Sequence, residues 1–244
     1  MSADTVEFGF VAALEREVSG LVRDWDSAKT RIEGVDRIIY RKQGAALICA
    51  GTGVARAYAA SRVLVEQCSP RVLVSIGFAG GLGELCPGSV VVPATVVEAA
   101  TGKSFATVFG VGQLATLDQV AGKELKDSSR ARFGAVAVDM EASGVAAAAV
   151  EWGKEFVAIK AISDGEDEDL GFLSDFVKPE GFETGRFVAH IATRPWLWKR
   201  VAALQANSEL ATASLKEAVV CCMSDWQEFS TSYSSPWRKF DERE

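Results

Sequence analysis

Apolar runs of strand length alternate with segments of helical spacing along the first two thirds of this chain. The apolar runs are residues 8–13, 44–50, 72–76, 135–139 and 156–162, and the helical segments are residues 14–22, 54–67, 121–131 and 141–152. Strands that helices cover on both faces are buried throughout, so they lose the polar alternation of half-exposed strands. The order therefore predicts an α/β fold with a largely parallel sheet between helices.

Length and composition predict one domain. The chain has 244 residues without a linker-like change in composition, so residues 1–225 are expected to form a single domain. Helices broken at Gly181, Gly185 and Pro195 are predicted from about Leu170 onward. The aromatic and polar stretch 226–244 is expected to be a loosely held extension.

Charge and residue counts exclude several classes of function. The net charge of −7 argues against a nucleic-acid-binding protein. No apolar stretch reaches the roughly 20 residues of a membrane span, and the acidic, polar start does not resemble a signal peptide, so a cytoplasmic location is expected. Five cysteines without a Cys-x-x-Cys pair and a single histidine predict free thiols, no metal site and no cofactor.

Two acidic segments stand at the ends of predicted strands. One contains Val138, Asp139, Met140 and Glu141, and the other ends at Asp164. Open α/β sheets bind ligands at the carboxyl ends of their strands. Carboxylates around a methionine suit a ribose, and an aspartate in a pocket can give a proton to a purine nitrogen. The alternatives are ordinary helix and turn caps, which the residues alone leave equally open.

Two further segments follow predicted strands. Residues 77–81 are small or glycine except for Phe78, so backbone amides could face a ligand there; the alternative is a tight turn. They match neither a dinucleotide fingerprint nor a P-loop. Glu15 and Glu17 follow the first strand. One of them could point inward and act on water; the alternative is that both lie at the surface.

The motifs together resemble one family. Residues 13–18, 51–54, 77–82 and 138–142 with 161–164 occur in the order found in the nucleoside phosphorylase and nucleosidase superfamily, and are most similar to its methylthioadenosine/S-adenosylhomocysteine nucleosidases. The resemblance spans residues 7 to about 165. It implies a three-layer α/β/α sandwich with a mixed sheet, and cleavage of the N-glycosidic bond of an adenine nucleoside by water. It also implies a homo-oligomer, with a dimer favoured.

The resemblance also implies roles for individual residues. Asp164 would protonate the leaving purine, Glu17 would position or activate water, and Met140 with Glu141 would hold the ribose. The other implied substrate-binding residues are Thr52, Gly53, Phe78, Ala79, Gly80, Gly81, Val120, Val138, Asp139 and Ser163. An isolated aspartate has a pKa of about 3.9, so burial or a proton shared with the base would have to raise the pKa of Asp164. Asp164→Asn is expected to lose most turnover and keep ligand affinity.

Several residues depart from the family pattern and leave alternatives open. Phe78 replaces a small hydroxyl residue, Val120 replaces an aromatic residue, and Lys160 stands where an arginine is common. Lys160 is the candidate to bind phosphate if phosphate replaces water, although Glu17 favours water. The departures also permit a nucleoside-binding protein that has lost catalysis.

A second branch, the hopanoid-associated phosphorylases, is also similar in its Ala-Val-Asp-Met-Glu run and its helical C-terminal region. That resemblance implies removal of adenine from an adenosyl lipid. The apolar tail of such a substrate would lie among Phe172, Phe176, Trp196 and Trp198. The alternative is that these aromatic residues are core or dimer contacts.

Overall fold

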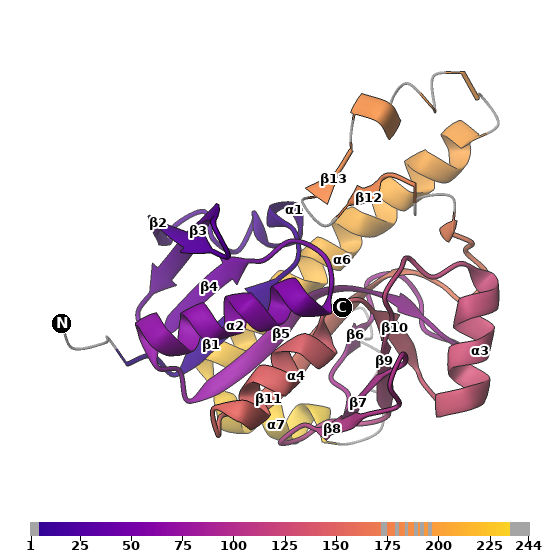
Figure 1. Ribbon diagram of the computed structural model, residues 1–244. Coiled ribbons are helices and arrows are strands. Elements are labelled where there is room, and N and C mark those ends of the chain that lie inside the picture. Colours follow the sequence, from indigo (N-terminus) through magenta and orange to yellow (C-terminus); the bar gives the residue numbers. More distant parts are fainter. Residues whose placement is uncertain are drawn as a thin grey trace, which may run out of the picture.

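Two long parallel strands form the centre of the computed structural model (Figure 1). The structure describes residues 5–171, 175–178, 181–183, 185–187, 190, 193–194 and 197–234. The central strands are β5 (Val72–Gly81) and β11 (Glu155–Asp164), and nearly all of their residues are buried. Their continuous apolar sequence is therefore explained by packing on both faces, as the sequence predicts.

The sheet extends from β5 to one side through β1 (Phe8–Ala12) and β4 (Ala45–Cys49), which run parallel to each other. β2 (Asp26–Ile32) and β3 (Val35–Lys42) complete this side as an antiparallel pair. β2 was not predicted from the sequence, because it is an edge strand with mostly exposed residues and therefore has no apolar run.

The other side of the sheet consists of short strands. β10 (Ala137–Asp139) pairs antiparallel with the last residues of β5 and parallel with β9 (Gln113–Thr116), which is followed by β7 (Thr95–Glu98) and the edge strand β8 (Ser104–Ala106). A further strand, β6 (Val90–Val91), pairs antiparallel with β11. The sheet is thus mixed and largely parallel, and it places the carboxyl ends of β5, β10 and β11 together.

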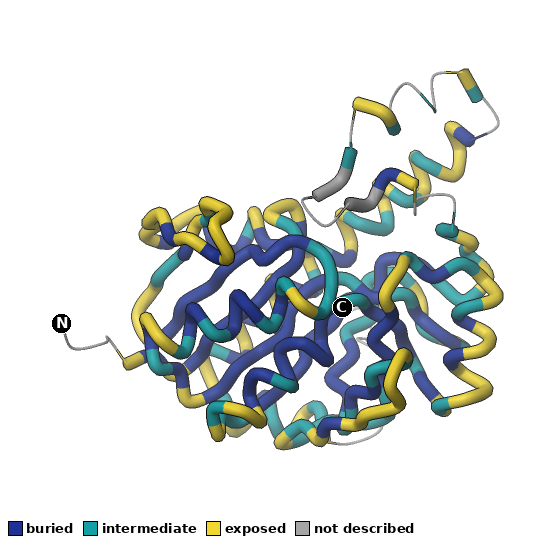
Figure 2. The backbone as a smooth tube through the Cα atoms, viewed as in Figure 1, coloured by how far each residue is buried: buried dark blue, intermediate teal, exposed yellow. Residues whose placement is uncertain are grey.

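Helices cover both faces of the sheet (Figure 1). One face packs on α2 (Val54–Cys68) and α4 (Ala142–Glu151), and the other packs on α1 (Glu15–Val18), α6 (Trp198–Ser224) and α7 (Trp226–Tyr233). α3 (Lys123–Phe133) lies beside β9. Figure 2 shows the buried strands between these helices. The arrangement confirms the expected three-layer fold class.

The contact between α2 and α4 is very close. A Cβ atom built on Gly144 would lie 2.1 Å from the backbone oxygen of Val54. Only glycine leaves room for this approach, which is why a glycine interrupts the alanine-rich sequence of α4.

The C-terminal region differs from the prediction in two respects. Residues 177–178 and 181–182 form the short strands β12 (Val177–Lys178) and β13 (Gly181–Phe182) in place of helix. Residues 226–233 are not loosely held, because they form α7, whose Phe229 is fully buried and whose Trp226 ring lies 5.3 Å from the ring of Phe8. Residues 235–244 lie outside the described residues. Among the described helices, including the long α6, none is apolar enough over a sufficient length to cross a bilayer.

Candidate active site

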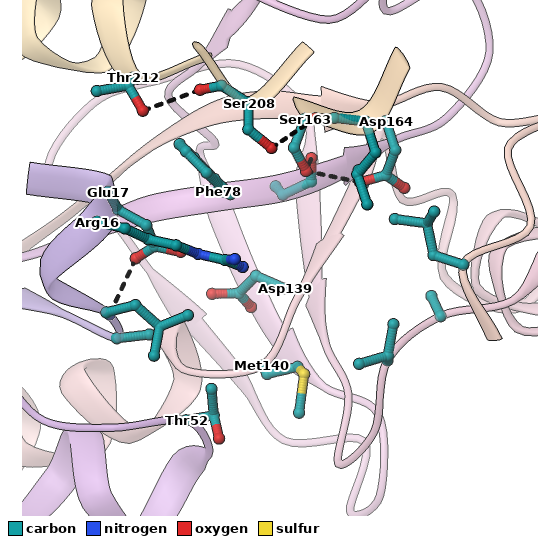
Figure 3. Close-up of a pocket in the computed structure, with 18 of the residues that line it drawn as sticks. Arg16, Glu17, Thr52, Phe78, Asp139, Met140, Ser163, Asp164, Ser208 and Thr212 are labelled. Carbon is teal, nitrogen blue, oxygen red and sulfur yellow. Dashed lines mark hydrogen bonds between the residues drawn. The ribbon is translucent and has the colours of Figure 1, made fainter. Parts of the chain in front are cut away.

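A cavity of about 800 Å³ opens at the carboxyl ends of the central strands (Figure 3). Four of the carboxylates that line it come from three separate parts of the chain before α6: Glu17 from α1, Asp139 and Glu141 from the junction of β10 with α4, and Asp164 from the end of β11. The strand register explains the convergence, because Gly80 of β5 is paired with both Val138 and Asp164. A bulge at Ser163 shifts the register just before Asp164.

Most of the predicted site residues border this cavity. They are Glu17, Thr52, Phe78, Ala79, Gly80, Val120, Val138, Asp139, Met140, Glu141, Ser163 and Asp164. Gly53, Gly81 and Lys160 do not line it. Gly53 contributes indirectly, since its backbone N–H donates to Glu141 Oε1 at 2.9 Å. Gly81 faces the packed interior, where an added Cβ would lie 2.9 Å from the side chain of Ile162.

Asp139 is held by protein donors on both of its carboxylate oxygens. Oδ1 accepts from the Thr116 hydroxyl at 2.7 Å, and Oδ2 accepts from the Ala142 amide and the Lys160 ammonium, each at 2.8 Å. These bonds fix the start of α4 and, with it, the neighbouring Met140 and Glu141. Asp139 therefore orders the junction of β10 with α4 in addition to bordering the cavity.

Lys160, the candidate to bind an anionic ligand, is buried among acidic groups and does not line the cavity. Its side chain is 1% exposed, and its ammonium is paired with Asp139. Burial lowers the pKa of Lys160, but the charges of Asp139 and Glu141 outweigh this effect and leave the pKa raised. The charge of Lys160 thus neutralises carboxylates within the protein, where an incoming phosphate would have to compete with them.

Glu141 and Glu17, which also line the cavity, take up protons more readily than exposed carboxylates. Burial raises the pKa of Glu141 to about 8, and the charge of Asp139 adds to this effect. Burial also raises the pKa of Glu17, against opposing contributions from its hydrogen bond with the Leu14 amide and from Lys160. A carboxylate with a raised pKa is a better general base near neutral pH.

Asp164 lies in a different environment from the one expected. Its side chain is 6% exposed, its Oδ1 accepts from the Ser163 hydroxyl at 2.6 Å, and its Oδ2 accepts from the Lys126 ammonium at 2.6 Å. The carboxylate is thus paired with a buried ammonium, a partner that the sequence analysis did not include. Lys126 was not predicted as a site residue, because it lies in a polar helical segment without a motif.

The far wall of the cavity is formed by α6. This helix contributes Val201, Leu204, Gln205, Ser208, Glu209, Thr212, Ala213 and Lys216. Figure 3 shows Ser208 and Thr212 across the cavity from Asp139 and Met140. Of the aromatic residues suggested for an apolar tail, Phe176 and Trp198 do not line the cavity, and Phe172 and Trp196 lie outside the described residues.

Comparisons with known proteins agree with this geometry. Residues 7–127 and 107–192 match the profile of the phosphorylase superfamily. The 5′-methylthioadenosine/S-adenosylhomocysteine nucleosidase of Marinomonas sp. (strain MWYL1) is 28% identical over 196 residues, which are 64% of this chain and 84% of that protein.

Solved structures share the fold at lower sequence identity. The 5′-methylthioadenosine nucleosidase of Arabidopsis thaliana in apo form has a TM-score of 0.69 and 17% identity, over 91% of this chain and 96% of that one. The S-adenosylhomocysteine nucleosidase of Streptococcus pyogenes, in complex with 5-methylthiotubericidin, has a TM-score of 0.59 and 22% identity, over 88% and 98% of the two chains.

Proposed function

This chain belongs to the phosphorylase superfamily, and from that premise we propose that it hydrolyses the N-glycosidic bond of an adenine nucleoside such as methylthioadenosine or S-adenosylhomocysteine. The observation that carries the proposal is the convergence of Glu17, Glu141 and Asp164 on one cavity. The relative from Marinomonas, a nucleosidase for these two compounds, supports the choice of substrate.

The charges of the cavity suit the transition state of this reaction. Breaking a glycosidic bond gives the sugar the character of an oxocarbenium ion. Carboxylates that are already in place favour this positive charge without reorganising. Glu141 would share hydrogen bonds with the ribose hydroxyls, and the thioether of Met140 would lie against the sugar. Glu17 would take the proton of the attacking water, and Asp164 would exchange a proton with a ring nitrogen of the base.

Water is favoured over phosphate as the nucleophile. A phosphate dianion needs cationic or amide donors around it. The ammonium of Lys160 is instead paired with Asp139, which would compete with a dianion for this cation. Arg16, whose guanidinium is a cation that phosphate could use, also lines the cavity. The assay below therefore measures the dependence on phosphate directly.

The assay follows free adenine released from methylthioadenosine or S-adenosylhomocysteine, with and without phosphate. Release in the absence of phosphate is the expected result. Release that requires phosphate would show a phosphorylase and refute the hydrolytic step. Binding without release would show a nucleoside-binding protein and refute catalysis.

Glu17→Gln tests the residue proposed to act on water. The change keeps the size of the side chain and removes its basicity, so we expect kcat to fall by about 10²- to 10⁴-fold. Glu15→Gln is a matched control, because Glu15 lies on the same helix and is exposed to solvent. Equal activity of the two variants would contradict the role of Glu17.

Two expectations from the sequence complete the proposal. The chain is expected to act in the cytoplasm and to form a homodimer. Size-exclusion chromatography with light scattering measures the second property, and a monomer at all concentrations would exclude it.

A further inference from the structure

A buried lysine that was not among the predicted site residues is paired with the carboxylate of Asp164. The side chain of Lys126 on α3 is fully buried. Its ammonium donates to Asp164 Oδ2 at 2.6 Å, to the backbone oxygen of Gly165 at 2.6 Å and to that of Glu168 at 2.9 Å. An ammonium has three protons, so these three acceptors use all of them.

The neighbouring strand makes room for this contact. A Cβ atom on Gly80 would lie 3.0 Å from Asp164 Oδ2 and 3.1 Å from Lys126 Cε. Any side chain at position 80 would therefore press between the carboxylate and the lysine. The glycine thus leaves the space in which Lys126 of α3 reaches Asp164 at the end of β11.

Two surface ion pairs hold the same loop to the same helix. Lys123 is paired with Asp167 at 2.9 Å, and Arg130 is paired with Glu166 at 2.7 Å. Both lysine and arginine are largely exposed in these pairs, so each contributes at most about 1 kcal/mol to stability. Lys126 differs because it is buried and because its partner lines the cavity.

We propose that Lys126 is a positioning residue that fixes the Asp164 carboxylate at the base end of the cavity for proton transfer to the base. The inference rests on the nucleosidase function proposed above. In the reaction, the electron pair of the C–N bond passes to the purine, and the proton of Asp164 passes to the purine nitrogen. Water adds to the sugar carbon and gives its proton to Glu17. Asp164 is then an anion, which Lys126 stabilises.

Several other charged groups near this site have partners of their own: Asp139 is paired with Lys160, Lys123 with Asp167, Arg130 with Glu166, and Glu168 with the amide of Asn207. Removing the charge of Lys126 should thus act chiefly on Asp164.

Lys126→Met in the full-length protein tests the inference, with adenine release measured from about pH 5 to about pH 9. We expect kcat to fall by about tenfold or more because the carboxylate loses its fixed geometry. We also expect the pH profile of kcat to change, and KM to change less than kcat. A purely structural role would not move the pH profile.

Lys123→Met is the matched control. Lys123 lies one turn earlier on α3 and is paired with the same loop, but it is exposed. We expect its kcat and pH profile to stay within about twofold of the wild type, since exposed pairs contribute little. An equal loss in both variants would show that the loop matters and the buried ammonium does not, which would overturn the proposal.

Two further variants keep the test decisive. Lys126→Met combined with Asp164→Asn should lose no more turnover than Asp164→Asn alone, because residues that act through one another are not additive. Gly80→Ala, which retains the charge but crowds the contact, is the test if Lys126→Met does not fold. It should lower kcat, and unchanged kinetics would overturn the proposal.

The failures of the two proposals can be told apart. A wild-type protein that releases no adenine refutes the proposed function. An active wild type whose Lys126→Met variant has the same kcat and the same pH profile refutes only the role of Lys126.

Discussion

Replacing Lys160 by methionine tests whether its buried charge stabilises the neighbouring carboxylates of Asp139, Glu141 and Glu17. Methionine preserves most of the length of the side chain and removes its charge. The ammonium of Lys160 lies 2.8 Å from Asp139 Oδ2, and its charge also lowers the pKa of Glu141 and Glu17. The variant therefore leaves all three acidic groups without their common cation.

The expected loss of stability follows from the burial of the pair. The side chains of Lys160 and Asp139 are 1% and 0% exposed. Breaking such a pair by removing one partner costs about 3–5 kcal/mol. Asp139 keeps its hydrogen bonds from Thr116 and Ala142, so we expect about 3 kcal/mol, the lower end of that range. For a chain of this length, that loss corresponds to a fall in Tm of about 6–12 °C.

Equilibrium urea unfolding at constant m-value measures the loss. The double variant Lys160→Met with Asp139→Asn is the control, because it removes both charges and should be more stable than the single variant. The single variant should also lose less stability at acidic pH, where protonation removes the charge of the orphaned carboxylate. A loss below about 1 kcal/mol, as for an exposed pair, would refute the reasoning.

Three further changes have expected outcomes in the same unfolding assay. Gly144→Ala forces a methyl group against the backbone of Val54, so it should cost about 1–3 kcal/mol or more; wild-type stability would contradict the close packing of α2 and α4. Thr116→Val removes the 2.7 Å bond to Asp139 and should cost about 1–3 kcal/mol. Burial raises the pKa of Glu141 from 4.5 to about 8, so the native state binds the extra proton and stability should fall as pH rises between these values. Glu141→Gln should flatten that part of the profile, and an unaltered slope would exclude the raised pKa.

The parts of the fold that were predicted correctly are those with a local signal in the sequence. β1, β4, β5 and β11 are buried on both faces, so their apolar runs identify them. β2 exposes most of its residues at the edge of the sheet and therefore has no such run. α7 was expected to be loose because its sequence is mixed, yet one aromatic residue, Phe229, anchors it in the core.

The candidate site divides in the same way. Strand ends and family motifs indicated Glu17, Glu141 and Asp164, and the structure brings them to one cavity. Lys126 could not be predicted, because its acceptors lie 38 to 42 residues further along the chain. A lysine in a polar helix is ordinarily solvated. Its burial depends on a tertiary contact that no local pattern records.

The wall that α6 contributes has a consequence for how the protein is made. Among the described residues, all other parts of the cavity lie before Trp198, whereas α6 supplies lining residues as far as Lys216. A nascent chain therefore carries the strands and every proposed acidic group before the residues of this wall are synthesised. Truncation before α6 would remove the wall and also the helices that cover one face of the sheet.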